Sequence, residues 1–451
     1  MSLLKGKNFL TPNDDGILSV DDAASIQNAI DAASRIGVNK VVIPRYNKRT
    51  DSMVWTIGAT VRIPGNMHLV LDNCYLQLAR DFAGQMFTNA LSQDEAGKLI
   101  AGEQTNICIQ GKGDAVLDGG GCSEAADPFA GTLLYLHNVR DFTVEGFRVV
   151  NCGGWGIGLM YCSYGKVAYI DFDSTGNAGV MLRCGCHDLT VEDITGYTGG
   201  SVVALHAMVG KQLEEPRHVM GHSVDVRNII IKNIKATTCS GGNILSLFNQ
   251  DGAVLYNVLI ENVSDISVPY TESRPFCAVR IGDGEAADVR SALHGETKNI
   301  TVRNVFTHAR YAVAISNTLA NSLMESIHLH DNGECAVGIC PGEEGNVTTL
   351  SNLLLKGIYY NVDQKTPDGT GELAPSDYAG EVLCFANCEG KNITVCQVLC
   401  ARAARLATVS GPLSVNITDV VIDELGDTLV CADEHAKVAY KNVKVKGEVQ
   451  K

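Results

Sequence analysis

The sequence contains no long apolar run and no apolar leader. No stretch of about 18 apolar residues occurs in the 451 residues, so we expect no membrane-spanning helix and no membrane partner. The first residues, Met1 to Asn8, lack the apolar core of a secretion signal. Together with the free thiols described below, this favours a cytoplasmic protein.

An excess of basic residues is also absent. The chain has 36 Lys and Arg against 51 Asp and Glu, which gives a net charge of −15. A protein that binds nucleic acid without sequence preference needs a cationic face for the phosphates. We therefore expect no nucleic-acid partner.

Cysteine is plentiful, but its pattern is not that of a disulfide scaffold or a metal site. The 16 cysteines are far below the density of a disulfide-rich domain and fall singly on apolar segments. A free buried cysteine behaves as a small hydrophobic residue. Cys184 and Cys186 have C-x-C spacing, but no second close pair completes a zinc site. We expect core thiols, no metal and no cofactor.

Helical periodicity is missing after residue 40. The one amphipathic pattern runs from Asp22 to Ile36, with Asp21 or Asp22 available to cap its start and Gly37 to end it. The strand-like segment Val41-Val-Ile-Pro follows directly. A helix in this position would cover the open end of a β-rich core.

A short phrase recurs along the rest of the chain. It consists of Asn or Asp, alternating β-branched residues, a polar pair and an apolar residue. Copies begin at His68, Asn106, Asp141, Asp188, Asn228, Asn257, Asn299, Asn352 and Asn392, and a degenerate copy begins at Lys166. The tightest spacings, 25 and 22 residues, are too short for propeller blades of about 40 residues. One such unit cannot bury its apolar face alone, so stacked coils with a shared core are expected.

The capping helix, the Val-Val-Ile-Pro strand and the Asn-led coils resemble the right-handed parallel β-helix of the pectin-lyase type. This resemblance covers nearly the whole chain. It implies an all-β, single-stranded right-handed parallel β-helix with an N-terminal capping helix. Residues 1–40 would form the N-terminal segment, and residues 41–451 one continuous domain.

Residues 140–285 are similar to polygalacturonase-like glycoside hydrolases of family 28. That family carries Asn-x-Asp, a later Asp pair, a His and an Arg-x-Lys, and uses two carboxyl groups to hydrolyse the glycosidic bond with inversion. Here Ala178 follows Asn177, Gly200 and Ser201 replace the Asp pair, and Asn243 lies where the His segment is expected. Arg280 is kept. The resemblance implies the scaffold without its usual acids.

Other acids could supply the chemistry. Alternation places Asp171 and Asp173 on one side of a strand, and Asp283 follows Arg280 closely. The candidate catalytic set is therefore Asp171, Asp173, Arg280 and Asp283. The alternatives are a solvated strand face for the first two and a turn for Asp283.

The candidate substrate-binding residues are Trp155, Asn177, Ser201, His206 and Asn243. Trp155 could form a sugar platform with Tyr161 and Tyr197, or pack in a loop. His206 could instead be structural. The Asn-x-Ser/Thr sequences at Asn262, Asn299, Asn346, Asn392 and Asn416 are better explained by the coil repeat, because Asn tolerates left-handed backbone and can stack in ladders.

The resulting prediction is a carbohydrate-active protein of the polygalacturonase-like class, acting on or binding an oligosaccharide or polysaccharide in a groove. If active, it would hydrolyse O-glycosyl bonds. The alternatives are a non-catalytic glycan-binding relative and a polysaccharide lyase, in which Arg280 is the base and acids bind calcium. Long coil faces could also pair, which leaves a homo-oligomer open.

Overall fold

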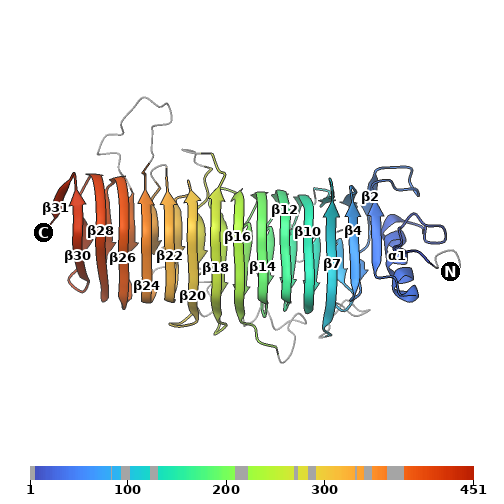
Figure 1. Ribbon diagram of the computed structural model, residues 1–451, viewed down its shortest axis with the longest axis horizontal. Helices are drawn as coiled ribbons and strands as arrows, with labels where there is room; N and C mark the ends of the chain where they lie inside the picture. Colours follow the sequence, from blue (N-terminus) through green and yellow to red (C-terminus); the bar gives the residue numbers. More distant parts are fainter. Residues whose placement is uncertain are drawn as a thin grey trace. The chain divides into compact units, whose positions relative to one another are not determined.

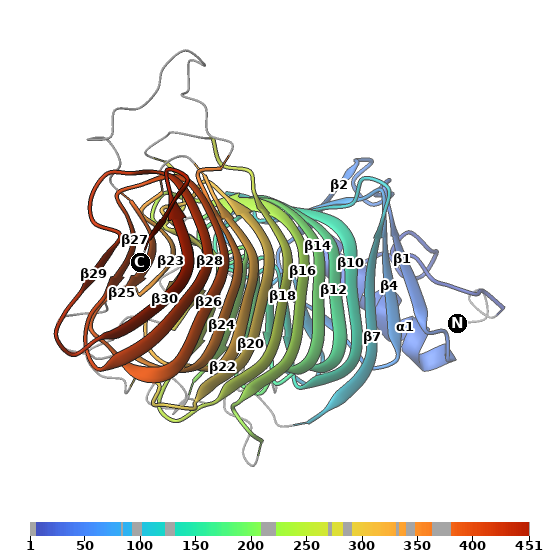
Figure 2. The ribbon, with the colours of Figure 1, turned by 60° about the vertical axis from the view of Figure 1, so that its left-hand side comes forward.

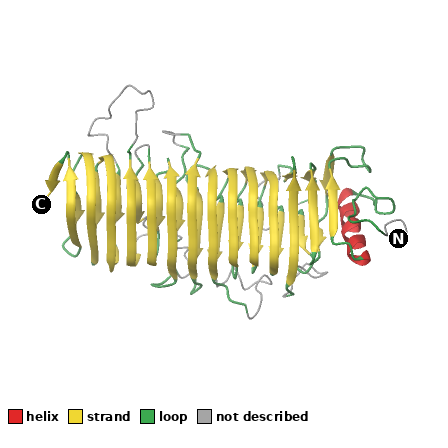
Figure 3. Cartoon of the chain, in the orientation of Figure 1, coloured by secondary structure: helices red, strands yellow, loops and turns green. Residues whose placement is uncertain are grey.

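The computed structural model describes residues 6–82, 84–92, 102–121, 131–208, 222–268, 273–282, 291–330, 333–339, 348–362 and 380–450. Its described elements are one helix and many strands (Figures 1 and 3). The chain forms two compact units. The N-terminal unit comprises residues 1–204 and 210–225, and the C-terminal unit residues 205–209 and 226–451. The predicted single domain over residues 41–451 stays a prediction.

The predicted capping helix is confirmed as α1 (Asp22–Ile36). The Asp21 side chain accepts the backbone N–H of Ala24, and Gly37 ends the helix in left-handed backbone at φ 73°. Ile26 and Ile30 are fully buried on the helix face that packs against β1 (Lys40–Pro44), β2 (Val54–Ile57) and β3 (Val61–Ile63).

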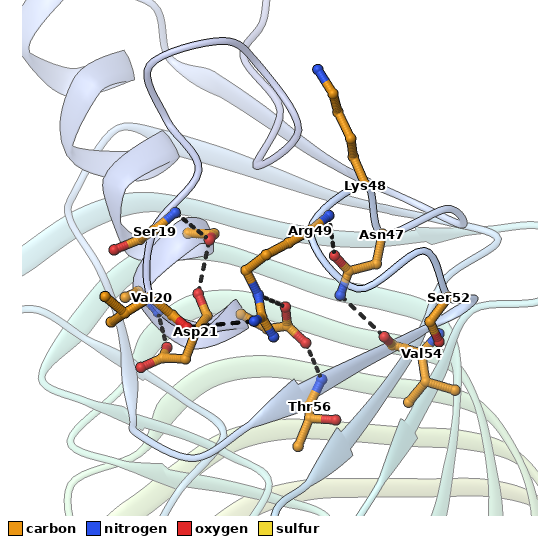
Figure 4. Close-up of polar contacts among 12 residues, drawn as sticks. Ser19, Val20, Asp21, Asn47, Lys48, Arg49, Ser52, Val54 and Thr56 are labelled. Atoms are coloured by element: carbon orange, nitrogen blue, oxygen red, sulfur yellow. Dashed lines mark hydrogen bonds and ion pairs between the residues drawn. The ribbon is translucent and has the colours of Figure 1, made fainter.

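A buried carboxylate fastens the start of this helix to the first coil. Asp22 is 1% exposed, and its carboxylate accepts hydrogen bonds from Arg49 Nε at 2.7 Å and from the Thr56 backbone N–H at 2.8 Å. Figure 4 shows Arg49 and Thr56 converging on this contact. Because a charged and a neutral donor both satisfy the carboxylate, its burial is compensated.

Long strands form one parallel sheet of the N-terminal unit. The principal members are β7 (Gln104–Lys112), β10 (Val139–Cys152), β12 (Ser163–Thr175) and β14 (His187–Thr198), paired in that order. β4 (Met67–Asp72), β5 (Tyr75–Leu78) and β8 (Val116–Asp118) complete its first coils. Short strands form the second sheet, in the order β3, β6 (Phe87–Asn89), β9 (Leu134–His137), β11 (Ile157–Met160) and β13 (Val180–Arg183).

The C-terminal unit repeats this arrangement. Its long strands pair in chain order as β16 (Val226–Thr238), β18 (Leu255–Asp265), β20 (Thr297–Thr307), β22 (Leu319–Leu329), β24 (Thr348–Tyr360), β26 (Cys388–Ala403), β28 (Leu413–Leu425) and β30 (Lys437–Val445). The short strands are β17 (Asn243–Asn249), β19 (Cys277–Ile281), β21 (Tyr311–Ile315), β23 (Cys335–Ile339), β25 (Glu381–Phe385), β27 (Arg405–Val409) and β29 (Val430–Ala432). β15 (Val203–Ala207) has residues in both units, and β31 (Glu448–Gln450) pairs antiparallel to β30.

Two left-handed residues bend most long strands, which explains the sequence repeat. Asn228 and Asn233 have φ of 55° and 58° in β16, and Asn257 and Asn262 take the same places in β18. Figure 2 shows these strands as curved ribbons. Equivalent asparagines of successive coils are hydrogen-bonded side chain to side chain, as in Asn257 to Asn228 at 3.0 Å.

The predicted asparagine ladder is confirmed for three of the five Asn-x-Ser/Thr sites. Asn262, Asn299 and Asn392 have left-handed backbone and lie in the ladder. Asn416 has neither property, so the prediction is wrong there, and Asn346 lies outside the described residues.

The predicted set of repeat copies differs from the coils of the structure in two respects. The predicted copies do not include the coil of β22, in which Asn321 takes the first left-handed place at φ 50°, or the last coils of β28 and β30. In β12 that place belongs to Tyr164, which lies 23 residues after Asp141 and 24 before Asp188, so the degenerate copy begins there and not at Lys166. A repeat defined by Asn or Asp at this place does not include a tyrosine.

Candidate functional site

Two of the predicted catalytic residues, Asp171 and Asp173, lie on the long-strand sheet of the N-terminal unit. Leu117, Val149 and Phe172 are in register and face the aliphatic interior. By alternation, the residues on either side of them lie on the opposite face of the sheet, which we call the outer face. One outer column holds Tyr75, Val116, Arg148, Asp171 and Thr195, and the next holds Gln77, Asp118, Val150, Asp173 and Tyr197.

We call Arg148, Asp171, Asp173, Thr195 and Tyr197 the Asp171 face. Arg148 Nε lies 3.2 Å from Asp171 Oδ2, and Arg148 Nη2 lies 3.8 Å from Asp173 Oδ2. The Thr195 hydroxyl donates to Asp171 Oδ1 at 2.7 Å. The two aspartate side chains are 44% and 69% exposed. Neither has the apolar surroundings that a proton-donating carboxyl requires, because both face solvent beside a guanidinium.

A third carboxylate, missed in the sequence, supports this face from one side. Asp118 is 2% exposed and accepts hydrogen bonds from Tyr75 at 2.5 Å, Gln77 at 2.8 Å, the Gly120 N–H at 2.8 Å and Asn151 at 3.2 Å. Burial alone would raise the pKa of Asp118, but these four donors hold it below its ordinary value.

The pKa of Tyr75 is shifted in the opposite direction. Partial burial and its bond to Asp118 raise the pKa of Tyr75 to about 12. Because Asp118 is shielded from solvent and accepts all four hydrogen bonds, it positions Tyr75, Gln77 and Asn151.

Trp155 precedes β11 and lies on the other sheet. Its ring is 2% exposed, the Arg183 guanidinium carbon is 5.4 Å from the ring centroid, and a Cβ on Gly158 would lie 3.0 Å from Trp155 Cε3. The ring is packed between neighbours, which supports the packing alternative over a sugar platform.

Asn177 and Ser201 lie in equivalent turns. Asn177 is exposed in the turn after β12, where its side chain accepts the Ala178 N–H at 2.8 Å. Ser201 lies in the turn after β14, and its carbonyl accepts the Gly179 N–H at 2.9 Å. Their proposed contacts with substrate stay predictions.

Arg280 and two of the predicted binding residues belong to the short-strand sheet of the C-terminal unit. Arg280 in β19 lies 5.6 Å and 5.9 Å from the ring centroids of Phe248 and Phe276, and its Nε donates to Ser316 Oγ at 3.3 Å. Within the described residues, no carboxylate lies within ion-pair distance of Arg280. We call Arg280, Phe248, Phe276 and Ser316 the Arg280 niche.

His206 and Asn243 flank this niche in the fold. His206 stacks on Phe248 with ring centroids 4.9 Å apart, and Asn243 Oδ1 accepts the Cys277 thiol at 3.1 Å. Asp283 lies outside the described residues. The four predicted catalytic residues are therefore not shown as one group: Asp171 and Asp173 share a long strand, and Arg280 is on a short strand of the other unit.

A buried histidine was also missed. His137 in β9 is 1% exposed, stacks on Tyr161 with ring centroids 5.8 Å apart, and has no hydrogen-bond partner for Nε2. Asn89 fixes its backbone by accepting the His137 N–H at 2.8 Å and donating to its carbonyl at 3.0 Å. Burial and nearby His222 lower the pKa of His137 to about 4.

Among the described residues, no group of three or more His, Cys, Asp or Glu is placed to hold a metal ion. The helix that the structure describes is too short to cross a membrane. The described cysteines are all free, and most of them are buried, so the predicted core thiols are confirmed for the buried ones.

Comparison with known proteins identifies the architecture. No family model matches the chain, and no curated protein matches it by sequence. Among solved structures, the pre-mature gene product 12 of bacteriophage phi29 superposes with a TM-score of 0.64 at 11% identity, over 95% of this chain and 55% of that one. The chain thus spans about half the length of that phage protein.

The superpositions on two further structures cover most of this chain and most of the other protein. The tailspike of Escherichia coli bacteriophage HK620, solved with a hexasaccharide, has a TM-score of 0.59 at 14% identity, over 97% of this chain and 80% of that one. The A-module of Azotobacter vinelandii mannuronan C-5 epimerase AlgE6 has a TM-score of 0.54 at 13% identity, over 97% and 99%. The fold is a right-handed parallel β-helix. The predicted pectin-lyase-like fold class is therefore confirmed, and the β-helix scaffold carries the Asp171 face on its long strands.

Proposed function

We propose that this β-helix protein is carbohydrate-active and that it binds an oligosaccharide or polysaccharide on the Asp171 face. The fold alone does not give a function. Support comes from two structural neighbours, a tailspike solved with a hexasaccharide and a mannuronan epimerase module, whose names both concern glycans.

The observation that carries the proposal is the pairing of an exposed aromatic ring with exposed charged groups. Tyr197 is 42% exposed and is in register with Asp173, while Asp171 and Arg148 lie in the next outer column. A ring presents an apolar face to sugar C–H groups, and carboxylate and guanidinium groups hydrogen-bond sugar hydroxyls.

The geometry favours binding over hydrolysis. A hydrolase needs one carboxyl that keeps its proton and one carboxylate that activates water. Asp171 and Asp173 both contact Arg148 and face solvent. Hydrolysis by a rearranged set of Asp171, Asp173, Arg280 and Asp283 stays the alternative.

The Arg280 niche supports a second candidate, recognition of an acidic glycan. Arg280 is partly buried beside two phenylalanine rings and contacts no carboxylate in the described part of the chain. A guanidinium held in this way is suited to a carboxylate or sulfate group of a ligand. A lyase that uses Arg280 as base would act on such a glycan.

The test is binding of the full chain to a panel of plant and bacterial oligosaccharides, mannuronan oligomers included. We expect D173N and D171N to weaken binding, and D427N to leave it unchanged. Asp427 is a matched control, since it is 52% exposed and ion-paired to Arg405 at 2.7 Å in the C-terminal unit. Loss of binding only in R280Q would favour the acidic-glycan candidate, and no binding to any member would reject both.

The same samples separate binding from catalysis. Release of reducing sugar that D173N abolishes would establish the hydrolase alternative. An unsaturated product, dependent on calcium and lost in R280Q, would establish the lyase. If neither product forms while binding persists, the non-catalytic interpretation stands.

A further inference from the structure

Two exposed tyrosines occupy backbone positions that the neighbouring coils give to Asn, Asp or Gly. Tyr164 and Tyr169 in β12 have φ of 52° and 55°. In the same columns, neighbouring coils place Asn106, Asp141 and Asp188 beside Tyr164, and Gly146 and Asp193 beside Tyr169, all with positive φ. Only this coil of the N-terminal unit carries a tyrosine at both bends of its described long strand.

This choice is unfavourable for the backbone. Left-handed backbone is accessible to Gly, Asn and Asp, whereas a bulky side chain there is an outlier. Such residues persist where the surrounding structure holds them, and they are concentrated at functional sites. Asn or Asp at the same places would fit the repeat with less strain.

Packing does not compensate for the strain. The interior of this coil is filled by Val167, Ile170 and Phe172, each about 1% exposed. Tyr164 and Tyr169 are 56% and 58% exposed. Their described contacts are confined to the surface: Tyr164 meets the edge of His187 at 5.7 Å, and Lys166 Nζ lies 5.5 Å from the Tyr169 centroid.

We propose that Tyr164 and Tyr169 are an aromatic platform for the sugar rings of an oligosaccharide, which we call the tyrosine platform. The inference rests on the proposed function and extends its site along β12, since Tyr164, Tyr169, Asp171 and Asp173 all lie on this strand. Four residues lie between the two tyrosines. The step of five residues spans about 16 Å or less along a strand, so the ligand has several rings.

The surroundings favour a glycan over a protein partner. Lys166 lies between the tyrosines and pairs with Glu192 at 3.1 Å and Glu145 at 3.8 Å. Charged groups are depleted from the centre of protein interfaces, where they would lose water. Beside an exposed ring they instead supply donors and acceptors for hydroxyl groups.

The test uses Y164N and Y169N in the full chain. Asn is the residue that other coils use at these bends, and the amide introduced by Y164N could donate to Asp141 as Asn442 donates to Asp419 at 2.6 Å. We expect each variant to melt at the same or a higher temperature than the wild type. We also expect each to bind the tightest oligosaccharide of the panel about tenfold more weakly, because one stacking contact is lost.

Y256N is the matched control. Tyr256 also faces outward on a long strand, with Lys298 Nζ 5.9 Å from its ring centroid, but its backbone is not left-handed. It should leave affinity unchanged and gain no stability. If the wild type binds and both platform variants bind equally well, the platform is refuted while the proposed function stands. If the wild type binds no member of the panel, the proposed function fails first, and a fall in melting temperature would refute the strain argument.

Discussion

The side-chain amide of Asn257 donates a hydrogen bond of 3.0 Å to the amide oxygen of Asn228, its equivalent one coil earlier. Asn299 in turn donates to Asn257 at 3.0 Å. Both partners have left-handed backbone. The repeat of asparagine in the sequence therefore has two physical causes: the bend needs a residue that tolerates positive φ, and the stack offers that residue a partner on each side.

Replacing Asn257 by Ala should destabilise the protein by about 2 kcal/mol. The change removes two hydrogen bonds, and alanine tolerates left-handed backbone less well than asparagine does. N257G should cost about half as much, since Gly tolerates the backbone. Chemical denaturation measures both. N416A is the control, because Asn416 is exposed on β28 without left-handed backbone. Equal effects of N257A and N416A would contradict the ladder.

Removing the Asp22 carboxylate should weaken the attachment of helix α1 to the first coil. D22A leaves Arg49 and the Thr56 N–H without their acceptor, and breaking a buried pair in this way costs about 3 kcal/mol. The solvent-exposed pair of Lys48 and Asp15, 3.1 Å apart with Asp15 81% exposed, is the comparison. D15A should change the free energy of unfolding by less than about 1 kcal/mol. A D22A protein as stable as D15A would show that this contact does not hold the cap.

His137 should make the protein less stable in mild acid. Its pKa is about 4 in the folded chain and about 6.5 in an unfolded one, so the unfolded state takes up the proton first as pH falls. The contribution of His137 to the free energy of unfolding is therefore highest above about pH 6.5. Proton uptake by His137 in the unfolded state lowers the free energy of unfolding progressively down to about pH 4, by a total of about 3 kcal/mol.

Denaturation of H137Q over this pH range should show a shallower loss of stability than the wild type. H435Q is the control, since His435 is 66% exposed. A wild-type slope that H137Q does not change would show that His137 takes up its proton without penalty in the folded state.

Buried and exposed thiols should differ in their reactivity toward a disulfide reagent. Burial raises the pKa of Cys186 well above its ordinary value, whereas Cys431 is exposed. C431S should therefore lower by one the number of thiols that a small disulfide reagent modifies in the native protein, because the thiolate is the reactive form. C186S should leave that number unchanged. Modification of Cys186 without unfolding would contradict the packed interior.

The fold could be predicted because its determinants are local and repeated. Helix α1 carries its own cap residues, Asp21 and Gly37, and the Asn-led phrase marks each bend by the residue that tolerates it. The coil of β12 was placed two residues late because tyrosines stand at its bends. These tyrosines with left-handed backbone, which do not fit the sequence pattern, are also the residues from which the tyrosine platform is inferred.

The candidate site was predicted only in part, since its contacts join residues far apart in the chain. Alternation correctly placed Asp171 and Asp173 on one strand face, but nothing in the sequence pairs them with Arg148 one strand away. Asp118 has four donors, of which Tyr75 and Gln77 come from β5, Asn151 comes from β10, and only Gly120 is close in sequence. Trp155 stood out by rarity, yet its packing against Arg183 and Gly158 became visible only in three dimensions.

The most direct test is a crystal structure of the chain with an oligosaccharide that it binds in solution. The result we predict is sugar rings over Tyr164 and Tyr169, with hydroxyl groups within hydrogen-bond distance of Asp171 or Asp173. Sugar bound only elsewhere, for instance in the Arg280 niche, with the outer surface of β12 left bare, would contradict the account.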